Sequence, residues 1–397
     1  MNSNQLIETP RVSQEVTMNQ ISMLFSPLRV GNLVLKNRIT MPPLYLGYAN
    51  PDGSVSDIMV DHYREMAASG ASLIVVENAG VAPSGLGTPV MLRADRDDLI
   101  PGLRTIANVI HEKDSLAFLQ INHAGRYAYT PARIAPSPVK VGDILPVEMS
   151  RTDIAQVVEA FARAALRVKE SGFDGVEVHG ATGYLLTQFL SPRTNKRDDA
   201  YGGTLAKRMR FPLEVVEAVK AAVGNDYPVG YRFIAEEFLP DGFHVDEAQA
   251  FAKELETRGV AYLSVAVGAH EAFQLPEYIQ LEKREAGRSE YAGPIKTSLA
   301  RTPVITAGRI QTPHTAEAIL REGRADLIGL GRILFADPLW PKKAAGEIGS
   351  PIVPCNPQCS LCLRRSHTGR PAICSQWEKD RRDAFLKRIH ETGDGTA

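Results

Sequence analysis

The chain has 397 residues, of which 44% are hydrophobic and 23% charged, as in ordinary globular proteins. Its 45 Lys and Arg residues balance 46 Asp and Glu residues, and the net charge of −1 excludes a strongly basic nucleic-acid-binding protein. No apolar run reaches the roughly 20 residues that span a membrane, and the N-terminus lacks the basic and apolar regions of a secretory signal. We therefore expect a cytoplasmic protein that binds neither nucleic acid nor membrane.

Residues 1–22 are polar and aperiodic, and we interpret them as a flexible N-terminal extension. From residue 24 the chain alternates short apolar runs with stretches of helical period. Continuous apolar runs are typical of strands that are buried on both faces, as in parallel sheets. The eight predicted strands are 38–44, 72–77, 117–122, 175–179, 229–233, 262–267, 304–307 and 326–331.

The stretches between these strands have the pattern of amphipathic helices. Residues 152–170 place apolar side chains on one stripe, with Thr152 and Asp153 as candidate caps and Gly172 after the end. Eight strand–helix units predict a (β/α)8 barrel over residues 23–345, followed by a cysteine-rich segment at 346–397. An open doubly wound sheet is the alternative, but it seldom needs eight such units, and no GxGxxG motif follows a strand.

Barrel enzymes carry their chemistry where the strands end, and two predicted strands end in histidine-containing segments. His179 ends the fourth strand and Tyr184 follows it, while His270 follows the sixth strand. A histidine can polarise a carbonyl oxygen, and a tyrosine hydroxyl can deliver a proton. The alternative is that these residues belong to a packed, hydrogen-bonded loop.

Polar residues at other strand ends indicate a binding site for an anionic ligand. Arg232 lies on the fifth strand, where it needs either an anionic ligand or a salt bridge with Glu177 or Glu236. The seventh and eighth strands end in Gly308-Arg309 and Gly331-Arg332. Barrels often bind phosphate at this position, although either loop alone is also compatible with an ordinary turn.

All four cysteines fall in one short segment, as Cys355, Cys359, Cys362 and Cys374. Four thiolates at this spacing suit a four-cysteine site for zinc or for an iron–sulfur cluster. Four unrelated free cysteines would rarely cluster this tightly, and disulfides are less plausible in a chain without a secretory signal.

Several long motifs resemble the old yellow enzyme superfamily of flavin-dependent ene reductases. They are Asn37-Arg-Ile39, Gln120-Ile-Asn-His-Ala-Gly-Arg126, the segment from Gly183 to Phe211 with its Ser-Pro-Arg-Thr-Asn run, and the segment from Gly323 to Arg332. The cysteines place the resemblance in the iron–sulfur branch, which includes 2,4-dienoyl-CoA reductase and 2-enoate reductase. The run Gly268-Ala-His270-Glu271 resembles the dienoyl-CoA reductase segment that carries a catalytic histidine.

The resemblance implies FMN as the cofactor, bound by residues from several strand ends. Gln120 would bond the pyrimidine edge of the flavin, Arg232 would lie near N1, and the two Gly-Arg pairs would hold the phosphate. Pro43 would flank the flavin ring, and Leu44, Tyr45 and Asn78 are further expected contacts. The four cysteines would ligate a [4Fe-4S] cluster.

The resemblance also implies the reaction, which is reduction of the activated C=C bond of an α,β-unsaturated carbonyl compound, either an enoate or an enoyl or dienoyl thioester. Tyr184, assisted by His270, would supply the proton. His179 and Thr182 would hydrogen-bond the carbonyl oxygen of the substrate, although the family usually has a second histidine or an asparagine at the position of Thr182. The electron source would be NADH or NADPH acting directly at FMN, or a separate redox protein that docks near the cysteines. The cluster would relay electrons to or from FMN. A homo-oligomer is also expected. The alternatives are an electron-transfer subunit of a larger complex and an oxidative N-demethylase.

Overall fold

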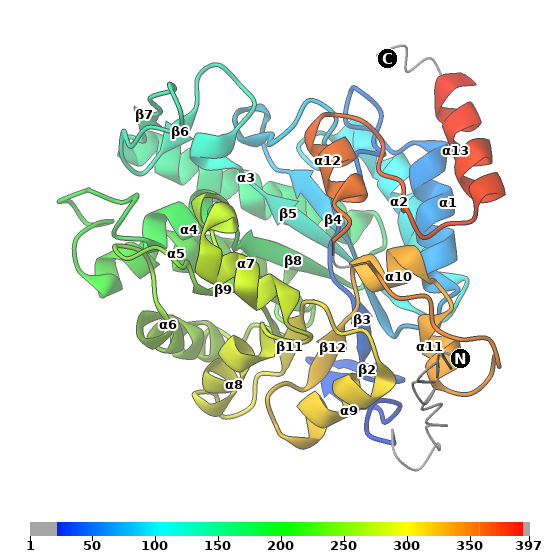
Figure 1. Cartoon of the computed structure of the whole chain (residues 1–397). Helices are drawn as coiled ribbons and strands as arrows, with labels where there is room; N and C mark the ends of the chain where they lie inside the picture. The colour runs from blue at the N-terminus through cyan, green and yellow to red at the C-terminus, as the bar shows by residue number, and fades with distance from the viewer. Residues whose placement is uncertain (1–21, 357, 392–397) are drawn as a thin grey trace, which may run out of the picture.

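The computed structural model describes residues 22–356 and 358–391, and eight parallel strands at its centre form a closed barrel (Figure 1). Each strand pairs with the next along the chain, and the last pairs with the first. The strands are β3 (Ile39–Met41), β4 (Leu73–Gly80), β5 (Leu116–Asn122), β8 (Gly175–Gly180), β9 (Val229–Glu236), β10 (Leu263–Val267), β11 (Val304–Ala307) and β12 (Leu327–Gly329). All eight predicted strands and the (β/α)8 barrel are thus confirmed.

Helices surround the barrel and return the chain from one strand to the next. They are α1 (Asp57–Ala67), α2 (Ile100–His111), α3 (Arg151–Glu170), α5 (Leu205–Val223), α6 (Val245–Thr257), α8 (Ser289–Thr297), α9 (Pro313–Arg321) and, after the last strand, α10 (Arg332–Ala336) and α11 (Trp340–Ala344). Two short helices, α4 (Leu185–Leu190) and α7 (Pro276–Lys283), lie in strand–helix connections, as does the two-stranded pair β6 (Ile134–Ala135) and β7 (Val147–Glu148).

Helix α3 follows the amphipathic pattern, but its cap differs from the prediction. Ser150, rather than Thr152, is the N-cap, because its hydroxyl accepts the backbone N–H of Asp153. The Asp153 carboxylate accepts the backbone N–H of Ser150 in return, which completes a capping box. Gly172 then ends the helix with a positive φ of 87°, a conformation that glycine adopts without steric cost.

An N-terminal hairpin closes the lower end of the barrel. Its strands β1 (Leu28–Val30) and β2 (Leu33–Leu35) pack in one apolar cluster with side chains from the barrel interior, among them Phe118 and Tyr262. The Phe118 ring lies so close to Gly175 that a Cβ there would meet it at 2.2 Å. The interior is therefore filled at this end, and the opposite end is left for chemistry.

The cysteine-rich segment packs directly onto the barrel. It includes α12 (Leu361–His367) and α13 (Lys379–Glu391), and α13 runs alongside α1 (Figure 1), to which Arg381–Glu65 and Arg388–Asp61 ion pairs of 2.7 Å tie it. The indole N–H of Trp377 donates to the carbonyl of Phe335 at 2.8 Å. The predicted N-terminal extension lies, apart from Ser22, outside the described residues.

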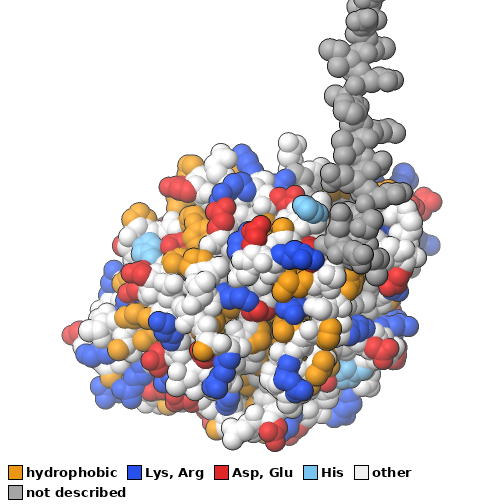
Figure 2. Space-filling view, turned by 90° about the horizontal axis from the view of Figure 1, so that it is seen from below, with side chains coloured by type: hydrophobic (Ala, Val, Ile, Leu, Met, Phe, Trp, Pro, Cys, Tyr) orange, Lys and Arg blue, Asp and Glu red, His pale blue; other side chains and the backbone are white. Residues whose placement is uncertain are grey.

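Positive and negative side chains are interspersed over the lower face, without a large area of one sign (Figure 2). This agrees with the balanced composition. In the part of the chain that the structure describes, no helix is both long and apolar enough to cross a membrane.

Candidate active site

The structure brings three predicted catalytic residues together at the C-terminal end of the barrel, which we call the mouth. Tyr184 is the N-cap of α4, just after β8. Its ring lies between two imidazoles, with centroid distances of 5.1 Å to His179 and 5.1 Å to His270. Residues from the β8 and β10 exits therefore form one site, as the positions of these residues in the sequence predict.

Burial raises the pKa of Tyr184 to about 12, with a smaller contribution from Tyr127. The phenol therefore keeps its proton at neutral pH. A buried phenol with an intact proton suits a general acid that protonates a carbon next to it.

His179 is held as a neutral hydrogen-bond donor. Burial, together with the charges of Arg232 and His270, lowers its pKa well below the usual value. Its Nδ1 accepts the backbone N–H of Ala181 at 3.3 Å, so the ring proton of the neutral imidazole sits on Nε2. Nε2 is then the atom that can donate to a ligand.

His270 begins the 3-10 helix η5 (His270–Gln274) and is also neutral at pH 7. Burial lowers its pKa to about 4, with further lowering by His367 and Arg126 and an opposing effect of Glu271. Its Nε2 is buried and has no hydrogen-bond partner among the described residues. This atom is therefore free to bond a ligand or a water molecule at the mouth.

Thr182 occupies the turn between His179 and Tyr184 with a φ of 64°. A β-branched residue rarely adopts positive φ, because its side chain crowds the backbone there, and such strain is concentrated at functional sites. The backbone turns tightly here, and the N–H of Tyr184 donates to the carbonyl of Ala181 at 3.2 Å.

A polar layer crosses the barrel interior below the mouth. The Gln120 amide donates to Glu177 at 2.7 Å, and the Tyr262 hydroxyl donates to the same carboxylate at 2.9 Å. Arg232 donates to Ser264 Oγ at 2.7 Å. Within the described residues, Arg232 forms no direct salt bridge with Glu177 or with Glu236. Burial lowers the pKa of Arg232, and the nearby charge of Glu177 opposes this lowering.

The loop after β3 carries Pro43, Leu44 and Tyr45, all half-buried, and Asn78 is half-buried near the end of β4. The Tyr45 hydroxyl bonds Thr88 Oγ1 at 2.8 Å. Burial raises the pKa of Tyr45 to about 12, and Tyr184 is near enough to add to that rise. This loop therefore lies beside the three-ring group.

The two Gly-Arg pairs lie at the β11 and β12 exits, as predicted, and the structure adds Arg288 and Glu282 to them. Arg288 donates to Glu282 at 2.6 Å, and Arg332 lies 3.6 Å from the same carboxylate. The Arg288 side chain lies against Gly308, where a Cβ would meet its Cδ at 2.5 Å. Arg309 donates to the carbonyls of Glu282 and Lys283.

Several buried polar atoms at the strand exits have no hydrogen-bond partner among the described residues. They are both amide atoms of Asn122, the hydroxyl of Thr306, Nε2 of His270 and Nε of Arg309. Buried polar groups normally find partners. These atoms come from the β5, β10 and β11 exits, and they fit a polar ligand that spans the mouth.

The four cysteines lie close enough to interact electrostatically. The charges of Cys355, Cys359 and Cys362 all contribute to the raised pKa of Cys374, which burial brings to about 11. Arg332 lies close enough to lower the pKa of Cys355 and Cys362 against the larger effect of burial. No three His, Cys, Asp or Glu residues of the described chain converge as the ligands of a single metal ion would.

Hydrogen-bond donors also point at two of the sulfurs. Cys359 Sγ accepts from Ser375 Oγ at 3.0 Å and from the backbone of Leu361 at 3.5 Å, and Cys374 Sγ accepts the backbone N–H of Gln376 at 3.4 Å. A donor set of four thiols with N–H and O–H donors around it fits an iron–sulfur cluster, whose sulfurs are commonly hydrogen-bonded.

The cysteine segment is fixed to the loop after β3. The N–H of Ala372 donates to the carbonyl of Leu46 at 2.8 Å, and the Tyr48 hydroxyl donates to the carbonyl of Ala372 at 2.7 Å. His367, at the end of α12, is near enough to affect His270. The segment therefore reaches the mouth, which the sequence spacing did not indicate.

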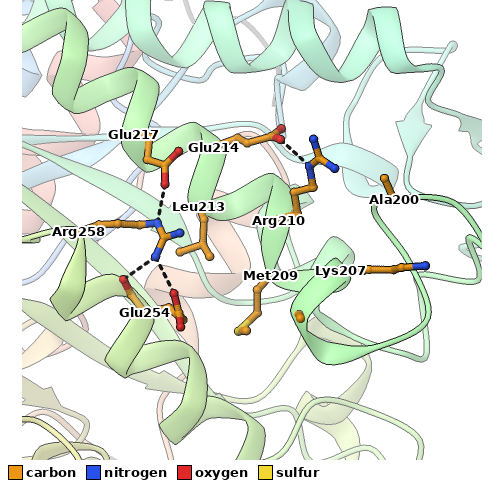
Figure 3. A pocket seen from close by; sticks show the side chains of 10 residues that line it. Ala200, Lys207, Met209, Arg210, Leu213, Glu214, Glu217, Glu254 and Arg258 are labelled. Carbon is orange, nitrogen blue, oxygen red and sulfur yellow. Dashed lines mark hydrogen bonds and ion pairs between the residues drawn. The ribbon is translucent and has the colours of Figure 1, made fainter.

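A surface groove of about 500 Å³ lies elsewhere, on the outer face of α5 and α6 (Figure 3). Met209 and Leu213 form part of its lining, and Arg258 pairs there with Glu217 and Glu254 at 2.7 Å. None of the predicted site residues lines it. Exposed ion pairs of this kind contribute little to stability. Because the predicted site residues lie at the mouth and not in this groove, we assign the chemistry to the mouth.

The sequence interpretation gave no role to three charged residues beside His270. Arg126 is buried within the Gln120–Arg126 motif, Arg193 lies in the Ser-Pro-Arg-Thr-Asn run, and Glu271 follows His270 directly. All three belong to motifs that carry the family resemblance. Their pairing, described below, requires the three-dimensional arrangement of separate loops.

Comparisons with known proteins agree with this fold. The chain is 43% identical over 336 residues to an NADH oxidase from Thermoanaerobacter brockii, covering 82% of this chain and 51% of that protein. It superimposes on 2-naphthoyl-CoA reductase, solved in complex with 2-naphthoyl-CoA, with a TM-score of 0.86, 28% identity and coverage of 90% and 57%. Morphinone reductase in complex with tetrahydroNAD gives a TM-score of 0.71, 28% identity and coverage of 84% and 93%.

The chain thus spans about half the length of the curated relatives that it matches first. A model of one flavoprotein family matches residues 23–350, which is most of the chain and includes every barrel strand. The resemblance to the old yellow enzyme superfamily is confirmed, and the chain belongs to the NADH:flavin oxidoreductase / NADH oxidase family.

Proposed function

We propose that the protein is an FMN-dependent reductase of the activated C=C bond of an α,β-unsaturated carbonyl compound, an enoate or an enoyl or dienoyl thioester. The observation that carries the proposal is the protonated Tyr184 phenol between two neutral imidazoles at the mouth. Two structural neighbours support the reaction class, since one was solved with an aromatic acyl-CoA and the other with a reduced nicotinamide analogue.

FMN would be held by the loop Pro43–Tyr45 and by Asn78, Gln120 and Arg232. Its phosphate would be held by Gly308, Arg309, Gly331 and Arg332. We add Arg288 to this set, because it lies against Gly308. When bound, reduced FMN supplies a hydride for the β-carbon of the substrate. The unpartnered Thr306 hydroxyl and Asn122 amide at the strand exits support an additional polar ligand there.

The side chains of this protein would orient the substrate and move the proton. His179 would donate from Nε2 to the carbonyl oxygen, with help from the Thr182 hydroxyl, and so draw electrons away from the β-carbon. Tyr184 would give its phenol proton to the α-carbon, or to a more distant carbon of a dienoyl system. The tyrosinate would recover a proton from water, with Nε2 of the neutral His270 as the relay. One hydride and one proton then convert C=C into CH–CH.

The four cysteines would bind an iron–sulfur cluster, whose chemistry is the transfer of single electrons. The cysteine segment lies next to the loop after β3, because the N–H of Ala372 donates a hydrogen bond to the carbonyl of Leu46. This position beside the mouth supports the assignment. NADH or NADPH is the expected electron source, and the naming of the relatives agrees with it. A separate redox protein docking near Cys355–Cys374 is the other source that we consider.

The test is anaerobic purification with flavin and metal analysis, followed by reduction of the bound flavin with NADH or NADPH. Mixing the reduced protein with 2-cyclohexenone, cinnamate and crotonyl-CoA should reoxidise the flavin and give the saturated products. A protein that binds FMN and is reduced, but is reoxidised by none of these compounds and only by an artificial acceptor, would instead be an electron-transfer subunit.

A further inference from the structure

The segment that carries His270 leaves the barrel at a sharp turn. Gly268 has a φ of 84°, and a Cβ there would meet the Tyr278 ring at 2.3 Å, so only glycine fits. The N–H groups of Gly268 and Ala269 donate to the carbonyls of Glu236 and Glu237 at 2.7 and 3.3 Å. Backbone hydrogen bonds to the last residue of β9 and to the residue after it thus fix the start of the segment.

The next residue, Glu271, is bound by arginines from two other barrel exits. Its Oε1 lies 2.8 Å from Nη2 of Arg126, which follows β5, and its Oε2 lies 2.9 Å from Nε of Arg193, which follows α4. Arg126 is only 1% exposed, whereas the side chains of Glu271 and Arg193 are each 33% exposed. One carboxylate therefore joins the exits of three different strands.

Arg126 is itself fixed in place. Its backbone N–H donates to Gln188 Oε1 at 3.1 Å, and its Nη2 donates to the Tyr127 hydroxyl at 3.0 Å. The Tyr127 ring packs against the His270 ring with a centroid distance of 4.6 Å. Contacts thus run in a closed circle from His270 through Tyr127, Arg126 and Glu271 back to His270.

Glu271 is the residue of this circle whose substitution tests the arrangement. Burial alone would raise its pKa, but the hydrogen bond from Arg193 and the charge of Arg126 lower it, so it is a carboxylate at neutral pH. Losing it would leave the buried Arg126 without an anionic partner, which is costly. Glu271 itself is partly exposed, and its carboxylate acts on the His270 ring through its charge.

We propose that Glu271 is a positioning residue, which holds His270 in its edge-on contact with Tyr184 by bridging Arg126 and Arg193. The consequence for catalysis rests on the proposed function, whereas the position of the ring does not. The inference extends the site beyond the three rings to a carboxylate that acts through His270.

The test compares Glu271→Gln with the wild-type protein by histidine NMR, using ring-labelled histidine and His270→Gln to assign the signal. The groups facing His270 are Arg126 and Glu271, His367 on α12, His179 on β8, and the phenols Tyr127 and Tyr184. If Glu271 acted only through its charge, its loss would lower the pKa of His270 still further. If it holds the ring in its buried place, its loss lets the ring reach water, and the pKa rises toward 6.5.

We expect that rise, together with a roughly 10- to 100-fold loss in the rate of substrate reduction and an unchanged rate of flavin reduction by NAD(P)H. A His270 pKa that stays near 4 or falls would overturn the proposal. If the wild-type protein reduces no unsaturated carbonyl compound, the proposed function fails, but the NMR result still decides the positioning role.

Two further variants complete the experiment. Arg193→Gln removes one half of the bridge and leaves Arg126 paired, so it tests the same idea if Glu271→Gln does not fold. It should give a smaller shift of the His270 signal in the same direction. Glu290→Gln is the matched control, because it breaks a two-bond ion pair with Arg284 at 2.8 and 2.9 Å that is about half exposed. Neither residue of this pair is among the groups that face His270. The control should leave both readouts unchanged.

Discussion

The ring of Tyr184 stands edge-on to the ring of His270, at 69° and with centroids 5.1 Å apart. The two residues are far apart in the sequence and come from the exits of β8 and β10. Burial keeps the phenol protonated and the imidazole neutral over the whole physiological range, because their pKa values are about 12 and about 4. A protonated phenol thus lies beside a neutral imidazole.

Replacing Tyr184 with Phe should remove the proton donor and keep the ring packing. General acid catalysis typically contributes about 10²- to 10⁴-fold, so the rate of substrate reduction should fall by at least about 100-fold. Reduction of the flavin by NAD(P)H should be unchanged, since it needs no proton from this residue. Stopped-flow measurement of the two half-reactions separates the effects. Turnover at the wild-type rate would exclude Tyr184 as the donor.

The strand pattern, the barrel and the strand-exit residues could be predicted because each depends on local sequence. Runs buried on both faces become parallel strands, and a residue at the end of such a run reaches the mouth. The pairing of Glu271 with Arg193 could not be predicted, because it depends on how two loops from different exits meet. The partner of Arg232 is Ser264 rather than a carboxylate for a similar reason, since Glu177 already accepts from Gln120 and Tyr262.

Glu77 should make the stability of the protein depend on pH. It is fully buried, its Oε2 accepts the N–H of Leu46 at 3.2 Å, and its Oε1 has no partner among the described residues. Burial raises its pKa from 4.5 to about 8. The folded state thus binds more protons than the unfolded state between these values, and the contribution of Glu77 to stability is lost as pH rises from 4.5 through 8.

Urea unfolding of the wild-type protein and Glu77→Gln between pH 6.5 and 8 checks this. The glutamine mimics the neutral carboxyl group, so the free energy of unfolding of the wild-type protein should fall relative to the variant by up to about 1.4 kcal/mol per pH unit. The buried His62 and His123 stay neutral in the folded state, because burial lowers their pKa values to about 3. Any protonation of these histidines in the unfolded chain is the same in both proteins and cancels in the comparison. Parallel pH profiles for the two proteins would show that Glu77 is ionised in the folded state.

Cys359→Ser should remove a cluster ligand without removing the flavin. The Sγ of Cys359 accepts hydrogen bonds from Ser375 and Leu361, and Cys359 is not among the residues proposed to hold FMN. We expect iron content and broad visible absorbance to fall several-fold, while the FMN content stays near that of the wild-type protein. Ser360→Ala is the control, because Ser360 makes no side-chain cap bond to α12. Zinc in place of iron in the wild-type protein would assign the cysteines to a structural site.

Thr182→Asn should improve both stability and substrate binding. Asparagine tolerates the left-handed region better than a β-branched residue, and a strained residue of this kind costs about 1–3 kcal/mol, so the free energy of unfolding should rise by about 1 kcal/mol. Its longer amide also reaches farther toward a carbonyl oxygen than the threonine hydroxyl does. The KM for an unsaturated carbonyl substrate should therefore fall, with little change in flavin reduction.

Thr182→Val separates the two effects. Valine keeps the β-branch and its strain but has no hydroxyl, so its stability should stay near that of the wild-type protein while KM rises. Urea denaturation and steady-state kinetics of both variants are the measurements. If valine and threonine give the same KM, residue 182 makes no bond to the carbonyl oxygen, and the grip on the substrate depends on Nε2 of His179 alone.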